Sequence, residues 1–154
     1  MKQIISKFKL QVIKEKEYEY NCSNIPKASC PYDVKEICAN ILGLAKEPEE
    51  VFGMITLDTK NNLTGYFEVS RGTISSSMVH PREVFKRAIL QNATSVILTH
   101  NHPSGDSQPS HEDIVLTNRL NECAKILGIN LMDHIIIGDA YIEDYYSFNE
   151  EKLL

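Results

Sequence analysis

Apolar and charged side chains alternate only loosely over the first twenty residues, which end in the mixed run KEKEYEY. This pattern predicts an edge strand with a charged outer face. Residues 21–30, NCSNIPKASC, are rich in turn-forming residues and predict a loop. From Asp33 to Lys46 apolar residues recur at near-helical spacing, which predicts one helix that Pro48 ends.

The pattern then changes to the two-residue period of strands. Val51–Asp58 and Leu63–Ser70 flank the polar turn Thr59–Asn62, and together they predict a β-hairpin. A looser segment follows, after which Pro81 opens a predicted helix that runs to about Asn92.

A short apolar strand is predicted over Ser95–His100, and the loop NHPSGDSQP follows it. Ser110 begins the next predicted helix, which stops at Gly128. The run INLMDHIIIG predicts another strand, and a weaker segment at 141–148 completes the chain. Strands and helices are intermingled, so the predicted class is α/β or α+β with one mixed sheet.

Composition adds limits on function. The 154 residues contain 16 Lys plus Arg against 21 Asp plus Glu, a net charge of −5. This balance argues against a sequence-independent nucleic-acid binder, whose affinity comes mainly from Lys and Arg. The charge is uneven, because the first twenty residues hold five Lys and three Glu, a local +2, while residues 139–154 hold five acids and one Lys, a local −4.

Cysteine use and hydropathy predict where the protein resides. The four cysteines form no C-x-x-C pair, and lysines interrupt any apolar signal region near the start. No apolar run approaches the 18 residues of a membrane span. We therefore expect a cytoplasmic protein with reduced thiols and no membrane partner.

The strongest chemical signal lies between the short strand and the helix that follows it. His100 and His102 leave the end of a strand, where alternation points both imidazoles the same way. The helix that begins at Ser110 presents Asp113 in its first turn. Two imidazoles and one carboxylate suit Zn²⁺, and three protein ligands leave a fourth position for water, as in catalytic sites.

Each part of this motif also has a simpler explanation. An H-x-H pair at a strand end is often incidental, and Ser110-x-x-Asp113 is close to a capping box. Ser110 can cap the helix while its hydroxyl faces the metal pocket, so the two roles are compatible. For His134, in the later apolar strand, we expect a packing or supporting role rather than direct ligation.

The pattern H-x-H-x7-S-x2-D over His100–Asp113 resembles the signature of JAMM (JAB/MPN) metalloproteases, and HNHPSGDSQPSHED resembles the RadC family in particular. Gly72–Phe85 and Asp133–Gly138 are similar to RadC segments before and after it. The resemblance implies a JAB/MPN-type (cytidine deaminase-like) fold, with a mixed sheet flanked by helices. We expect this domain over residues 31–154, after a strand and loop extension at residues 1–30.

The resemblance also implies roles for single residues. The two histidines and Asp113 become the zinc ligands, and Ser110 becomes the residue that stabilises the tetrahedral intermediate. The family's general base is a glutamate at the start of an earlier strand, which falls on Glu50. Glu49 stays an alternative, because alternation would point only one of the two side chains at the metal.

The leading hypothesis is a zinc metallopeptidase in which a zinc-activated water attacks a peptide or isopeptide bond. Its partner would be a peptide or protein substrate, and a ubiquitin-like conjugate is one candidate. The oligomeric state stays open, with a dimer among the options.

Two alternatives follow from other features. The family association favours a DNA-repair-associated binding protein with a non-catalytic metal site. Full-length RadC proteins carry an N-terminal helix-hairpin-helix region, however, and residues 1–30 show no pair of short helices, so nucleic-acid binding is not favoured. A third hypothesis is a JAMM-like fold that binds a partner's tail without cutting it.

Overall fold

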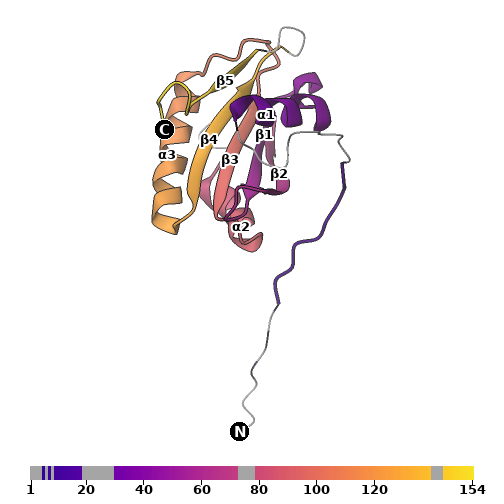
Figure 1. The fold of residues 1–154 in the computed structure, drawn as a ribbon, viewed down its shortest axis with the longest axis vertical. Helices are drawn as coiled ribbons and strands as arrows, with labels where there is room; N and C mark the ends of the chain where they lie inside the picture. The colour runs from indigo at the N-terminus through magenta and orange to yellow at the C-terminus, as the bar shows by residue number, and fades with distance from the viewer. Residues whose placement is uncertain (1–4, 6, 8, 19–29, 73–78, 140–143) are drawn as a thin grey trace.

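Five strands form one mixed sheet in the order β2-β1-β3-β4-β5, and helices cover both of its faces (Figure 1). The computed structural model describes residues 5, 7, 9–18, 30–72, 79–139 and 144–154. Neighbouring strands are antiparallel except β3 and β4, which are parallel. This confirms the predicted class. The strands are β1 Val51–Leu57, β2 Leu63–Arg71, β3 Ser95–Asn101, β4 Asn130–Ile137 and β5 Tyr145–Ser147.

The predicted hairpin is confirmed as β1 and β2, and Asp58 organises its turn. The Asp58 carboxylate accepts hydrogen bonds from the backbone N–H of Lys60 at 2.8 Å and of Asn62 at 2.9 Å. Asn61 takes a left-handed conformation, with φ at 60°, which asparagine tolerates better than most residues. The polar run between the two apolar strands therefore closes as a tight turn.

The first helical region is broken into three pieces, where the sequence predicted one helix over Asp33–Lys46. An α-helix, α1, spans Pro31–Glu36, a π-helix spans Ile37–Ile41, and a 3-10 helix spans Leu44–Lys46. Gly43 separates the last two with φ at 77°, a left-handed conformation that a helix cannot continue through. The prediction of one continuous helix was wrong, because apolar spacing does not distinguish an α-turn from a wider π-turn.

The other two helices agree with the sequence prediction. Helix α2 spans Pro81–Leu90, and α3 spans His111–Leu127 and crosses from β3 to the parallel strand β4. Ser110 caps the start of α3, and Gly128, with φ at 69°, ends it.

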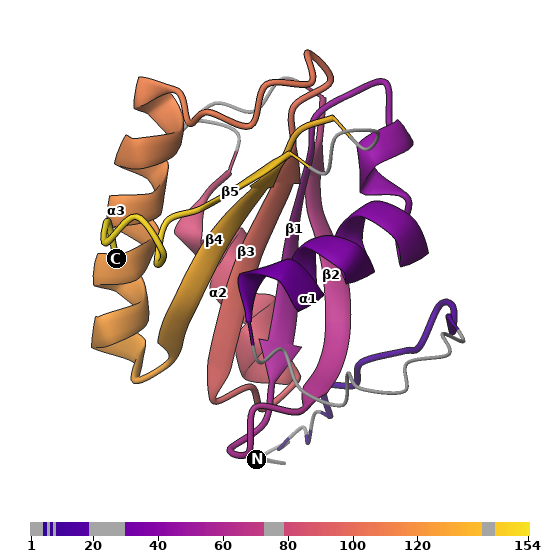
Figure 2. The same ribbon diagram turned by 45° about the horizontal axis from the view of Figure 1, so that its top comes forward.

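Two apolar cores lie on opposite faces of the sheet, as expected from the alternation of strand side chains. On β1, Phe52 and Met54 join the core beneath α2 and α3, whereas Val51 and Ile55 join the core beneath α1. Figure 2 shows α1 in front of the sheet and α2 behind it. This alternation decides which residues at the strand ends can reach the candidate site.

The chain before residue 30 differs from the sequence prediction where it is described. Residues 9–18 are exposed and contain neither helix nor strand, in place of the predicted edge strand, because they pair with no strand in the described part of the chain. The predictions for residues 21–29, 73–78 and 141–143 fall outside the described residues. Among the helices that the structure describes, none has the length and apolar character that crossing a membrane requires.

Candidate metal centre

The end of β3 supplies two of the predicted ligands. Val96 and Leu98 face the core beneath α2 and α3, and alternation places His100 on the same side of the sheet. His100 is only 1% exposed. His102 follows the strand, and its backbone N–H donates to the carbonyl of Ile137 at 2.9 Å, which keeps this part of the chain beside β4.

The first turn of α3 supplies the third predicted ligand, Asp113, through a capping box. The Asp113 N–H donates to Ser110 Oγ at 3.2 Å, while Asp113 Oδ2 accepts from the Ser110 N–H at 2.8 Å. Asp113 Oδ2 also accepts from the Ser110 hydroxyl at 2.6 Å. These bonds hold the carboxylate against the helix start and fix its direction.

Residues between β4 and β5 anchor the loop that joins His102 to α3. The Ser107 N–H donates to Asp144 Oδ2 at 2.9 Å, and the Asp139 N–H donates to the carbonyl of Gly105 at 3.0 Å. At Gly138 a Cβ atom would lie 2.7 Å from the carbonyl oxygen of Gly105, so any other side chain would displace the loop. The loop is therefore held in position by close packing.

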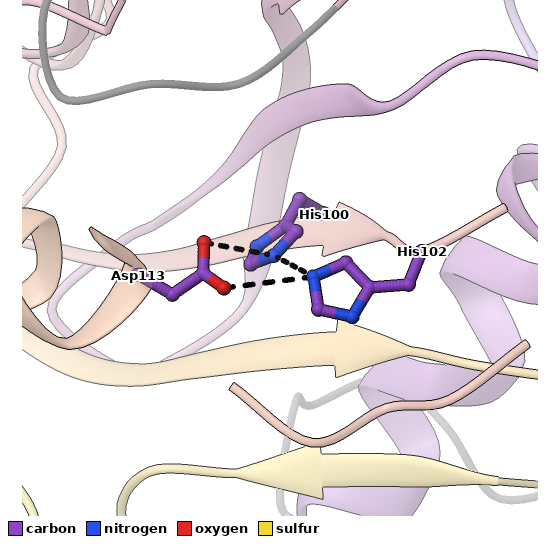
Figure 3. Close-up of side chains that lie close together, drawn as sticks. All are labelled: His100, His102 and Asp113. Atoms are coloured by element: carbon purple, nitrogen blue, oxygen red, sulfur yellow. Dashed lines mark hydrogen bonds and ion pairs between the residues drawn. The ribbon is translucent and has the colours of Figure 1, made fainter. Parts of the chain in front are cut away.

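The three side chains meet at one point (Figure 3). The two Nε2 atoms of His100 and His102 are 3.0 Å apart. His100 Nε2 lies 3.4 Å from Asp113 Oδ1, and His102 Nε2 lies 3.6 Å from Asp113 Oδ2. In a tetrahedral zinc site with bonds of about 2.0–2.1 Å, neighbouring ligand atoms are about 3.3 Å apart. The observed separations are close to that spacing.

The electrostatics of the three groups differ. Burial lowers the pKa of His100 to about 4, so its ring is neutral at pH 7. The Asp113 carboxylate raises the pKa of His102 against the effect of burial, with smaller contributions from the carbonyl of Asp106 and from Glu50. Burial would raise the pKa of Asp113, but the neighbouring imidazoles and Ser110 outweigh it and hold that pKa well below its ordinary value. The centre therefore attracts positive charge.

The donor set fits a metal ion. His102 Nδ1 lies 2.7 Å from the carbonyl of Asp106, which can only accept, so Nδ1 carries a proton and the neutral ring leaves Nε2 bare. His100 likewise uses Nδ1 for a contact with His134 and turns Nε2 toward the centre. When both rings are neutral, lone pairs from two nitrogens and a carboxylate thus face one another, and a metal ion or a proton on His102 relieves their repulsion. The cluster could bind a metal ion, and such a site with three protein ligands leaves a coordination position for water.

Comparison with known proteins agrees with this geometry. Residues 28–153 match the RadC-like JAB domain. The chain belongs to the RadC-like JAB domain family. The family resemblance seen in the sequence motifs is therefore confirmed.

The curated relatives are UPF0758 proteins. One from Clostridioides difficile is 47% identical over 124 residues, which cover 80% of this chain and 51% of that protein. One from Clostridium perfringens is 44% identical over 128 residues, covering 83% and 54%. One from Clostridium acetobutylicum is 54% identical over 101 residues, covering 66% and 43%. The chain thus spans about half the length of these relatives.

In this RadC-like chain the strand register distinguishes the two candidate bases. Phe52 on β1 lies opposite His100 on β3, and the same antiparallel register continued two residues outward places Glu50 opposite His102. Alternate side chains of a strand lie on the same face of the sheet, so Glu50 is expected on the face that carries the two histidines and Glu49 on the opposite face. Glu50 is half-buried, Glu49 is exposed, and the charge of Glu50 contributes to the raised pKa of His102. The register favours Glu50.

A cleft of about 450 Å³ adjoins this side of the RadC-like site. Both candidate bases line it, and its lining residues come from the segment just before β1, the residue just after β2 and the loop after His102. The lining residues are Pro48, Glu49, Glu50, Gly72, Pro103 and Ser104. Glu49 and Glu50 therefore line this cleft, whereas the three predicted metal ligands are not among its lining residues.

The hydroxyl of Ser110, which the family resemblance assigns to the tetrahedral intermediate, is engaged within the protein. It donates to Asp113 Oδ2 at 2.6 Å and accepts from the Asp113 N–H. The capping prediction is confirmed, and the hydroxyl contacts the carboxylate of a predicted metal ligand. Its catalytic role stays a prediction, which requires the hydroxyl to rotate away from Asp113.

Sequence reasoning missed Asn101, which stands between the two histidines in the RadC-like motif. It is buried, and because it is the residue next to His100 on the strand, its side chain lies on the opposite face of the sheet. There Asn101 Oδ1 accepts from the Val51 N–H at 2.8 Å, and its amide donates to the carbonyl of Glu49 at 3.1 Å. A buried amide between two ligands at a strand end was the available signal.

Proposed function

We propose that this chain is a zinc-dependent metallohydrolase of the JAMM type that cleaves a peptide or isopeptide bond. The observation that supports it most is the convergence of ligand atoms from His100, His102 and Asp113 within 4.8 Å of one another. Nitrogen and carboxylate ligands in this combination suit Zn²⁺ better than Mg²⁺ or Ca²⁺, which prefer oxygen. A three-ligand set is typical of catalytic rather than structural zinc.

The chemistry divides between the ion and the protein. When bound, Zn²⁺ supplies a Lewis acid that polarises the scissile carbonyl and lowers the pKa of a water molecule. The Glu50 carboxylate then accepts a proton from the attacking water while the water oxygen bonds to the carbonyl carbon. Glu50 returns that proton to the leaving nitrogen as the C–N bond breaks, so the products are a carboxylate and an amine.

Besides capping α3, Ser110 stabilises the transition state in this proposal. Its hydroxyl, which donates to Asp113 Oδ2 at 2.6 Å, rotates toward the substrate oxygen as negative charge develops there. A donor placed in this way acts mainly in the transition state, because the charge that it stabilises exists only there. Asp113 retains the backbone hydrogen bond from Ser110 at 2.8 Å throughout.

The proposed substrate is a polypeptide, with a ubiquitin-like conjugate as one candidate. The cleft beside Glu50, about 450 Å³ in volume, supports a ligand larger than a single amino acid. Cys30, Cys38 and Cys123 are thiols rather than disulfides, which supports the cytoplasm as the place of action.

The test compares two neighbouring carboxylates. Purified protein loaded with Zn²⁺ is assayed on a panel of peptide and isopeptide substrates, together with Glu50→Gln and the matched control Glu49→Gln. We expect Glu50→Gln to keep the metal and lose at least about 100-fold in kcat, as for loss of a general base, while Glu49→Gln keeps its activity. Equal loss in both variants, or full activity of Glu50→Gln, would contradict the assignment.

The same preparation addresses the DNA-associated alternative. Zinc bound at full stoichiometry without hydrolysis of any substrate, together with salt-sensitive DNA binding, would favour a binding protein. The net charge of −5 argues against that outcome.

A further inference from the structure

We propose that His134 and Thr117 are positioning residues that lock His100 in the one tautomer able to bind a metal. The inference rests on the proposed metal site and extends it to two residues that do not face the ion. It follows from the direction of three consecutive hydrogen bonds, which run from α3 through β4 to β3.

The chain of bonds begins at the helix that carries Asp113. Thr117 Oγ1 lies 2.6 Å from the backbone carbonyl of Asp113 and 2.6 Å from His134 Nδ1. The carbonyl can only accept, so the single hydroxyl proton of Thr117 points to it. His134 Nδ1 must therefore carry a proton and donate it to Thr117 Oγ1.

The second step passes this constraint to the ligand. The ring of His134 contacts three neutral partners, the Thr117 hydroxyl and the rings of Phe52 and Phe148, at centroid distances of 5.5 Å and 5.0 Å for the two phenyl rings. It is also fully buried, at 0% exposure, so the neutral ring is favoured. With its only proton on Nδ1, His134 Nε2 is bare.

The third step fixes His100. His100 Nδ1 lies 2.8 Å from the bare His134 Nε2, so Nδ1 must be the protonated nitrogen of His100. Its Nε2 is then bare and faces His102 Nε2 at 3.0 Å and Asp113 Oδ1 at 3.4 Å. The opposite tautomer of His134 would accept from Thr117 and donate to His100 Nδ1, and it would put the proton of His100 on Nε2, where the metal must bind.

The same chain links two of the three ligands. It starts at the backbone of Asp113 and ends at the ring of His100, while the Asp113 carboxylate meets that ring from the other side. A shift of α3 against the sheet would therefore disrupt both the hydrogen bonds that fix the tautomer of His100 and the arrangement of the ligand atoms. Partners that orient histidine ligands in this way support metal affinity by about 10- to 100-fold.

Thr117→Val tests the lock with almost no change in volume. The valine leaves the proton on His134 Nδ1 without an acceptor in a buried site, which favours moving it to Nε2. His134 then donates to His100 Nδ1, and His100 Nε2 becomes protonated. Thr117→Ser keeps the hydroxyl and should restore the parent behaviour. Thr99→Val is a matched control, because Thr99 is equally buried on β3 beside His100 but lies outside this chain of bonds.

The first measurement is the tautomer itself, from side-chain nitrogen NMR of the metal-free chain at pH 8. We expect a protonated Nδ1 and a bare Nε2 on His100 in the parent, in Thr117→Ser and in Thr99→Val. Thr117→Val should shift His100 toward the Nε2-protonated form. A parent protein with the proton on Nε2 of His100 would overturn the inference, whether or not the protein hydrolyses anything.

The second measurement is Zn²⁺ affinity by competition with a chelator. Thr117→Val should bind about 10- to 100-fold more weakly than the parent, and Thr117→Ser and Thr99→Val should bind as the parent does. Thermal unfolding of the metal-free variants checks that each is folded. Unchanged affinity in a folded Thr117→Val would overturn the inference, and so would equal loss in Thr117→Ser.

Discussion

Asn101 Oδ1 accepts a 2.8 Å hydrogen bond from the backbone N–H of Val51, and this bond links the strand end that carries the two proposed histidine ligands to the proposed base. Asn101 lies between His100 and His102 at the end of β3, while Val51 follows Glu50 at the start of β1. The carbonyl of Glu50 is held from the other side by the N–H of Gly72 at 2.9 Å. The backbone at Glu50 is thus fixed by the strand that carries the ligands and by the end of β2.

Asn101→Ala should separate base placement from metal binding. The Val51 N–H loses its acceptor and the start of β1 loosens, so we expect kcat to fall at least about 10-fold while the metal content stays unchanged. A buried N–H without a partner costs about 1–3 kcal/mol, which urea unfolding would show. Asn40→Ala, at an exposed asparagine in the π-helix, is the matched control. Loss of metal in Asn101→Ala would contradict this separation.

Metal affinity should fall as the solution is acidified below neutral pH. The pKa of His102 is raised by the Asp113 carboxylate, so its proton competes with the metal at a higher pH than for an ordinary histidine. Chelator competition between pH 5 and pH 8 measures the effect. Glu50→Gln removes one of the charges that raise this pKa and should move the curve slightly to lower pH. A metal affinity that did not vary over this range would rule out His102 as a ligand.

Stability of the metal-free protein should fall on acidification between pH 6.5 and pH 5. Burial lowers the pKa of His100 to about 4 in the folded state, whereas its ordinary value is 6.5. The unfolded chain therefore binds the proton first, and the stability present above pH 6.5 is lost as the pH falls toward 4, by about 1.4 kcal/mol for each pH unit.

Urea unfolding at several pH values, with His100→Leu as the comparison, measures this slope. The pKa of His102 is raised, so its contribution to stability falls as the pH rises. That change occurs above pH 6.5, outside the pH range in which His100 acts. Burial also lowers the pKa of His134, so His134 contributes to the slope in the same pH range. The leucine variant should lose the part of the slope that His100 contributes between pH 6.5 and pH 5 and keep the part from His134. An equal slope in both proteins would mean that His100 is not the group responsible.

Ser110→Gly should distinguish helix capping from catalysis. Glycine is a tolerable N-cap residue, so the variant should lose only a few tenths of a kcal/mol in stability. It lacks the hydroxyl, however, and removal of an oxyanion donor typically costs about 100- to 1000-fold in kcat. Ser110→Thr retains the hydroxyl and should keep part of the activity. Full turnover of Ser110→Gly would leave Ser110 as a cap alone.

Much of the site could be predicted because it is local in sequence. The alternation of β3 brings His100 and His102 to one side, and the capping box brings Asp113 into the first turn of α3. Strand alternation and the capping box each depend on a few neighbouring residues, so both can be recognised in the sequence. The β1–β2 hairpin was predictable for the same reason, since Asp58 and Asn61 belong to a short turn.

The groups behind the ligands could not be predicted in the same way. Thr117 and His134 are 17 residues apart, and their contact depends on how α3 packs against β4. Asn101 reaches a backbone group 50 residues earlier, through the pairing of β1 with β3. The break at Gly43 was missed because the apolar pattern continues through it. Such contacts follow from tertiary packing, which periodicity does not specify.

Metal content of three purified proteins tests the central claim most directly. Parent protein, His102→Ala and the control His111→Ala, at an exposed histidine at the start of α3, are equilibrated with Zn²⁺, desalted and analysed for metal. We predict one zinc ion per chain in the parent and in His111→Ala, and loss of the ion from His102→Ala. A parent protein without zinc, or His102→Ala with as much zinc as the parent, would contradict the account.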